Sequence, residues 1–122
     1  MHVAMMLYAG FRLLEVTGPM DVFHEANRLC GATLYEQHLV GPSPGPVPCS
    51  SGVAVGTTEC LFDLHTSYDI VVVPGSPMNI TGREHGELVD WLSDAGRTVR
   101  RLASVSNGAF LSRAPGLPTI AR

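Results

Sequence analysis

The strongest constraint on the fold is an uninterrupted apolar run, Asp69-Ile-Val-Val-Val-Pro74, near the middle of the chain. A second continuous apolar run covers residues 2–8. Short apolar runs bounded by turn residues are typical of strands that are buried on both faces, as in a parallel sheet. The sequence therefore predicts two buried strands here, and further strands over residues 33–40 and 99–105.

Two helix patterns separate these strands. The first helix is predicted to begin at Gly18-Pro19, because proline favours the first helical position, and to stop at Gly31. The second is predicted to begin at a capping box, Thr81-Gly-Arg-Glu84, and to end at Gly96. Its apolar stripe, which should face the sheet, consists of Leu88, Val89, Trp91, Leu92 and Ala95.

The alternation of strands and helices predicts a single α/β domain over residues 1–122, with a parallel sheet that carries helices on both faces. The Pro/Gly-rich segment 41–48 is predicted to be a surface loop that leads into a short β arm at residues 49–55. Ligands of such sheets bind outside the carboxyl ends of the strands. The segments expected at that edge are residues 8–15, 74–79 and 105–108.

Composition and charge disfavour several classes of function. A net charge of −3 gives no basic field for nucleic acid, and no apolar run approaches the roughly 20 residues of a membrane helix. No signal peptide is recognised, and three Cys without a C-x-x-C pair argue against a disulfide framework. Five His show neither i, i+4 pairs nor Cys at ligand spacing, so no metal site is predicted. We expect a cytoplasmic protein without a cofactor.

Ser106 lies between a predicted strand and a predicted helix, in Ser104-Val-Ser-Asn-Gly108. One interpretation is a nucleophile elbow, in which a tight turn exposes the side chain beside backbone amides. The alternative is a Ser that caps the following helix. The spacing alone favours the cap, because S-x-G triplets are common.

Two other turns carry candidate residues. Gly75 and Ser76 follow the buried strand, and their amides could bind an oxyanion, although an ordinary turn fits equally well. Glu15 stands in an apolar stretch just before the predicted helix start. A buried carboxyl group can keep its proton and donate a hydrogen bond, whereas the alternative is a cap or loop carboxylate that faces water.

These three turns, in this order, resemble the ThiJ/PfpI (DJ-one/PfpI) superfamily of the class I glutamine-amidotransferase-like fold. Residues Gly10–Phe23 are similar to the motif G-F-x-L-L-D-x-x-G-P-x-D-V-F of its GlxA-type branch, which includes ligand-sensing domains of AraC-family regulators and the isonitrile hydratases. Segments 45–52, 73–75 and 103–110 are similar to three further motifs of that branch. The resemblance implies a three-layer, flavodoxin-like α/β fold.

The resemblance also implies a site. Ser106 takes the place of the family's elbow Cys and Glu15 that of its acid partner, while the oxyanion or ligand-binding positions fall on Gly75, Ser76, Asn107 and Gly108. Asn107 stands where the branch usually has Thr, and Ser76 where the family has Gly. A Ser hydroxyl needs an adjacent base, and no His follows Ser106.

The leading hypothesis is therefore a non-catalytic, small-molecule-sensing domain related to GlxA/AraC-type transcription regulators. One alternative is an isonitrile hydratase-like or amidase-like enzyme that uses the Ser106 and Glu15 pocket. The other is a truncated fragment without activity.

The end of the chain departs from the family pattern. Residues 113–122 diverge, and the match covers roughly the N-terminal two-thirds of a family domain, so we expect a truncation after the elbow helix. Residues 99–105 should then have an unpaired edge, which favours a homodimer or aggregation. The competing possibility is that residues 117–120 fold back as a substitute strand, although Pro118 lacks the N–H for a ladder bond.

Overall fold

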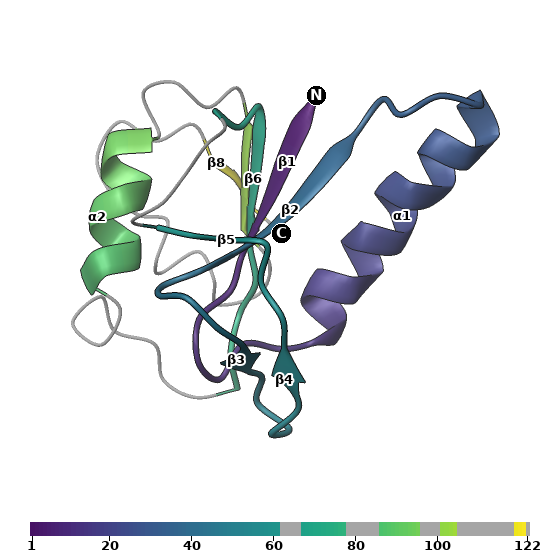
Figure 1. Ribbon diagram of the computed structural model, residues 1–122. Coiled ribbons are helices and arrows are strands. Elements are labelled where there is room, and N and C mark those ends of the chain that lie inside the picture. The colour runs from purple at the N-terminus through teal and green to yellow at the C-terminus, as the bar shows by residue number, and fades with distance from the viewer. Residues whose placement is uncertain (62–66, 78–85, 96–100, 105–118, 122) are drawn as a thin grey trace.

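In the part of the chain that the structure describes, a parallel sheet lies between two helices. The computed structural model describes residues 1–61, 67–77, 86–95, 101–104 and 119–121. Six strands pair in the order β5-β2-β1-β6-β7-β8, and every pairing is parallel. Helices α1 (Leu14–Cys30) and α2 (Gly86–Ala95) lie on opposite sides of the sheet (Figure 1). The predicted three-layer, flavodoxin-like α/β architecture is confirmed.

The strands are short. The sheet consists of β1 (His2–Met6), β2 (Glu36–Gly41), β5 (Glu59–Cys60), β6 (Ile70–Val73), β7 (Arg101–Ser104) and β8 (Thr119–Ala121). A separate antiparallel hairpin, β3 (Val47–Pro48) with β4 (Ala54–Val55), projects below the sheet (Figure 1). The arm predicted at residues 49–55 therefore begins earlier, because β3 lies in the segment 41–48 that was predicted to be a loop. In the described part of the chain, no helix is long and apolar enough to cross a membrane.

The core is centred on β1 and β6, as the two apolar runs predict. Residues 3–6 of β1 are at most 1% exposed, and residues 71–73 of β6 are also buried. Leu88 and Leu92 of α2 pack onto this core, which confirms the phase predicted for that helix, and Trp91 packs against it while partly exposed. The capping box 81–84, Gly96 and the side chain of Ala95 lie outside the described residues.

Helix α1 begins earlier than the sequence pattern predicted. It starts at Leu14 and contains Pro19 as its sixth residue, whereas we placed the start at Gly18-Pro19. The extra turn is held by buried Val16 and by the carbonyl of Leu13, which accepts bonds from the N–H and the hydroxyl of Thr17. The packing of this turn thus outweighs the loss of the backbone hydrogen bond that Pro19, which has no N–H, cannot donate within the helix. The helix ends at Gly31 with φ 67°, as predicted.

Two strand boundaries also differ from the sequence interpretation. Strand β2 begins at Glu36 rather than residue 33, because the Asn27 side chain binds the preceding loop: its Oδ1 accepts the N–H groups of Leu34 and Tyr35, each at 2.9 Å. Strand β5 was not predicted, since two residues show no periodicity. It is held beside β2 by pairing with residues 40 and 41.

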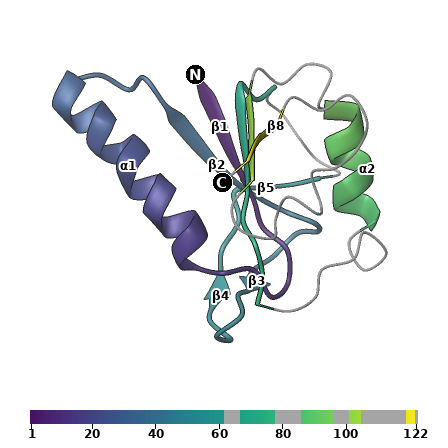
Figure 2. The ribbon, with the colours of Figure 1, turned by 180° about the vertical axis from the view of Figure 1, so that it is seen from behind.

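The predicted unpaired edge of residues 99–105 is wrong for the described part of that strand. Strand β8 pairs with β7 over Leu102–Thr119, Ala103–Ile120 and Ser104–Ala121. The ladder begins at Thr119, so its described pairs do not include the proline that argued against it, and Thr and Ile suit a strand. Figure 2, seen from behind, shows β8 beside the other strands. The argument for a homodimer through the β7 edge is therefore lost, and association of copies remains a prediction.

The packing of α2 gives a stability prediction. Leu92 is 1% exposed, so Leu92→Ala should lower the free energy of unfolding by about 2–5 kcal/mol through lost burial and a cavity. Leu29 is 73% exposed in α1 and offers the same substitution as a control, which should change stability by less than about 0.5 kcal/mol. Urea unfolding followed by circular dichroism measures both. Equal effects of the two variants would contradict the described packing.

Candidate functional site

The strand order predicts a ligand crevice at the carboxyl ends of β1 and β6. The chain runs from β1 to β2 and β5 on one side, and then returns to β6, β7 and β8 on the other. Strand order therefore reverses between β1 and β6, and ligands of open parallel sheets bind at such a reversal. The segments that follow these two strands, residues 7–13 and 74–77, carry the described part of the candidate site.

Glu15 links the two strand-end segments. The Gly75 N–H donates to Glu15 Oε1 at 2.8 Å, and the Arg12 N–H donates to the Gly75 carbonyl at 2.8 Å. Arg12 Nε lies 3.5 Å from Glu15 Oε2, and the Glu15 side chain is 17% exposed. Both backbone polar groups of Gly75 are thus bound, the N–H by Glu15 in the first turn of α1 and the carbonyl by Arg12 just before it. Glu15 sits in the first helical turn, where a negative charge is favoured by the helix dipole.

Tyr8 provides a second link between these segments. Its hydroxyl donates to the Pro74 carbonyl at 2.7 Å, and the residue is 1% exposed. Burial raises the pKa of the Tyr8 phenol well above its usual range, and the nearby negative charge of Glu15 raises it further. Tyr8 therefore stays a neutral hydrogen-bond donor at all physiological pH values.

The β3–β4 hairpin lies against the same turn. The Gly10 N–H donates to the Pro48 carbonyl at 3.0 Å, and the Ser50 N–H donates to the Phe11 carbonyl at 2.8 Å. Next to this contact, Cys49 Sγ lies 3.1 Å from the Ser51 hydroxyl, and this hydrogen bond lowers the pKa of the Cys49 thiol. The arm thus helps to fix the position of the β1–α1 turn through residues 10 and 11, next to the residue that binds Gly75.

The structure brings together only part of the predicted site. Glu15 and Gly75 are in contact, and Ser76 beside them is 3% exposed. Ser106, Asn107 and Gly108 lie outside the described residues, so their roles remain predictions. The Glu15 side chain is not a loop carboxylate that faces water, because Oε1 accepts the Gly75 N–H and Oε2 faces the Arg12 guanidinium.

Sequence reasoning missed Arg12 and Tyr8. The i, i+3 spacing of Arg12 and Glu15 could have indicated their ion pair. Tyr8 gave no such signal, because its partner is a carbonyl 66 residues away. A backbone acceptor at that separation becomes visible only once β1 and β6 are paired.

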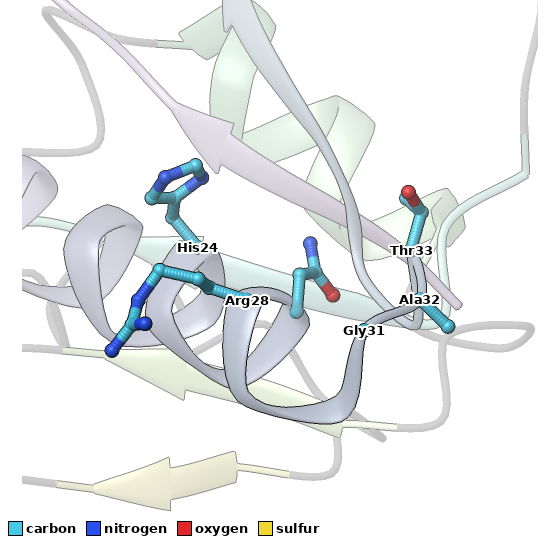
Figure 3. Close-up of a pocket in the computed structure, with 6 residues that line it drawn as sticks. His24, Arg28, Gly31, Ala32 and Thr33 are labelled. Carbon is cyan, nitrogen blue, oxygen red and sulfur yellow. The ribbon is translucent and has the colours of Figure 1, made fainter.

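A surface depression at the other end of α1 does not belong to this site. This open depression of about 400 Å³ is lined by His24, Asn27, Arg28, Gly31, Ala32 and Thr33. Figure 3 shows the lining side chains as sticks at the end of α1 and in the loop that follows. Asn27 comes twelve positions after Glu15, which corresponds to a rise of about 18 Å along the helix. Asn27 is already bound to the loop before β2, and Arg28 pairs with Glu25, so we assign no ligand to the depression.

The fold and the strand-end turns are those of a known class of protein. The chain matches the DJ-1/PfpI family over residues 1–119, and it therefore belongs to that family. The recognised family and its regulator-related branch are thus confirmed.

Individual relatives include regulators. A protein encoded in the cpoL 5′ region of Streptomyces lividans is 36% identical over 122 residues, which cover 95% of this chain and 80% of that protein. The HTH-type transcriptional regulator GlxA of Rhizobium meliloti (strain 1021) is 28% identical over 125 residues, covering 95% of this chain and 36% of the regulator.

Solved structures with a similar fold include a ThiJ/PfpI family protein and a regulator. An AraC family transcriptional regulator from Pseudomonas putida superposes with a TM-score of 0.70 at 28% identity, covering 93% of this chain and 69% of that one. A ThiJ/PfpI family protein from Pseudomonas syringae superposes with a TM-score of 0.75 at 20% identity, covering 90% and 43%. The chain thus spans well under two thirds of the GlxA regulator and of the Pseudomonas syringae protein.

The Glu15–Gly75 contact gives a second prediction. Glu15→Ala should destabilise the protein by about 1.5–3 kcal/mol, since it removes a charged acceptor from a backbone N–H. Amide hydrogen exchange at Gly75 should become faster in this variant. Glu25→Ala removes an exposed carboxylate in the same helix, and it should leave the stability and the exchange rate at Gly75 close to those of the parent. Unchanged exchange at Gly75 would show that the contact does not form in solution.

Tyr8 gives a pH prediction. The pKa of Tyr8 is raised in the folded state, whereas an unfolded Tyr ionises near pH 10. The contribution of Tyr8 to the free energy of unfolding is therefore full below about pH 10 and is lost as the pH rises further. Tyr8→Phe should therefore show a shallower loss of stability between about pH 9 and 11 than the parent. Urea midpoints measured across this range test it. Parallel pH curves for the two proteins would refute the assignment.

Proposed function

We propose that the chain is a non-catalytic, small-molecule-sensing domain related to those of GlxA- and AraC-type transcription regulators. The observation that carries the proposal is the state of Glu15 at the sheet reversal: Oε1 accepts the Gly75 N–H at 2.8 Å and Oε2 faces Arg12. A carboxylate so engaged organises a turn and is poorly available as a general base.

The sequence supports the same conclusion. The elbow position carries Ser106 instead of the Cys that the family resemblance implies, and a Ser hydroxyl needs a base to become a nucleophile. Glu15 would be the nearest candidate in the resembled site, and its oxygens already face donors. The relatives named as regulators are consistent with sensing.

The ligand class follows from the groups around the crevice. Arg12 offers a guanidinium that is about half exposed, so it can reach a bound anion or a polar oxygen. The aromatic residues Tyr8 and Phe11, which follow β1, are buried and make the surroundings of the turn apolar on that side. We therefore propose a small ligand with one polar or anionic group on a compact apolar body, held without covalent chemistry.

The test separates binding from turnover. A panel of small amides, isonitriles and carboxylates is added to the parent chain, and both the melting temperature and product formation are measured. We expect at least one compound to raise the melting temperature, as a ligand of the folded state must, without any product. Sustained conversion of an amide or isonitrile that Ser106→Ala abolishes would overturn the proposal in favour of an enzyme.

A further inference from the structure

A network of titratable side chains lies at the opposite end of β1 from the site above. His2 Nδ1 is 3.0 Å from His38 Nε2 and 3.1 Å from Glu36 Oε2. His38 Nδ1 is 2.7 Å from Glu59 Oε1, and Glu59 also accepts a hydrogen bond from the Tyr68 hydroxyl. His2 and Tyr8 are six strand residues apart, about 20 Å, so this network is separate from the Glu15 crevice.

We propose that His2, Glu36 and His38 bind a divalent transition-metal ion of the Zn²⁺ class. One ligand atom from each residue, an imidazole nitrogen or a carboxylate oxygen, lies within 4.8 Å of the other two. Ligands about 2.0–2.1 Å from a tetrahedral Zn²⁺ are about 3.3 Å apart, so the contacts at 3.0 and 3.1 Å are close to the required spacing. Two imidazoles and one carboxylate leave the fourth position for water.

The sheet register creates this cluster. His2 is the register partner of Glu36, and His38 is the partner of Ala4, two residues further along β1. Residues two apart in a strand share a face of the sheet, so the three side chains converge although His2 and His38 are far apart in sequence. This is why a search for His and Cys at short ligand spacing predicted no metal site.

Glu59 sets the state of the His38 ring. A carboxylate at 2.7 Å requires His38 to carry its proton on Nδ1, which leaves the Nε2 lone pair directed at His2. Metal-binding His typically donate their second ring N–H to a carboxylate in this way. The Glu59 and His38 side chains are only 10% and 12% exposed, and the Tyr68 ring packs against that of His38 in a tilted arrangement, with the ring centroids 5.4 Å apart. The His38 ring is therefore held in a ligating orientation before any ion arrives.

The other two ligands are reachable from solvent. The side chains of His2 and Glu36 are 38% and 62% exposed, so an ion can enter without unfolding the sheet. The backbone of His2 is nevertheless fixed, because its N–H donates to Asp69 Oδ2 at 2.8 Å and its carbonyl accepts the Asp69 N–H at 2.9 Å. When the ion binds, the His2 proton that now bridges the two rings moves to Nε2 through water, and the freed Nδ1 lone pair takes up the metal.

The ligand set selects the metal class. Imidazole nitrogen with one carboxylate suits Zn²⁺, Ni²⁺ and Cu²⁺, whereas Mg²⁺ and Ca²⁺ prefer sites built from oxygen ligands. We therefore expect one Zn²⁺ per chain and no response to Mg²⁺. Binding should be independent of the sensing proposal, because no residue of the Glu15 crevice takes part.

Zinc titration of the untagged chain, monitored by calorimetry or with a competing chromophoric chelator, tests the site. His38→Ala should abolish the tight Zn²⁺ binding, and Glu36→Gln should weaken it at least tenfold. His24→Ala, an exposed His of α1, and Cys30→Ser, an exposed thiol, are the matched controls and should bind Zn²⁺ as the parent does. Glu59→Gln should weaken binding by about 10–100-fold, since it loosens the His38 ring.

Spectroscopy gives a readout that does not depend on affinity. Co²⁺ in this site should show the visible absorption of a four-coordinate ion, lost in His38→Ala. If His38→Ala does not fold, the Zn²⁺ affinity of Glu36→Gln tests the site instead. The Glu36 side chain is mostly exposed, so this substitution leaves the core intact. A parent Kd above about 1 mM, or equal affinities of the parent and Glu36→Gln, would overturn the proposal and leave a hydrogen-bond network alone.

Discussion

The position of β1 between β2 and β6 is the constraint on which the described structure depends. β1 is paired on both edges and buried on both faces, so every other layer is placed relative to it. Its two ends then acquire different chemistry. The carboxyl end leads toward Glu15, which accepts a hydrogen bond from Gly75. The amino end holds His2 beside β2. One short strand therefore positions both candidate sites.

Polar contacts at the carboxyl edge connect strand ends that are far apart in the chain. The Gly75 N–H donates to Glu15, the Gly75 carbonyl accepts the Arg12 N–H, and the neighbouring carbonyl of Pro74 accepts the Tyr8 hydroxyl. Buried backbone groups must find partners, and here the β1–α1 turn supplies them to the turn after β6. The geometry from which we propose ligand binding is thus the same geometry that satisfies these backbone groups.

Much of the fold could be predicted because it rests on local patterns. Continuous apolar runs identified β1 and β6, and the stripe with Leu88 and Leu92 gave the phase of α2. Helix α1 ends at Gly31, whose backbone takes the left-handed conformation (φ 67°) that glycine adopts without strain. The errors occurred where long-range contacts outweigh local preference: the early start of α1 despite Pro19, the two-residue β5, and the pairing of β8 with β7.

By itself, the sequence determined the α/β class, the family resemblance and the candidate roles of Glu15 and Gly75, because these depend on patterns and motifs within short segments. The tertiary structure decided which side chains meet. The contacts of Glu15 with Gly75 and of His2 with His38 join residues that are 60 and 36 positions apart. Such pairs arise from strand order and register, and a one-residue shift in register would turn the His38 side chain to the other face of the sheet.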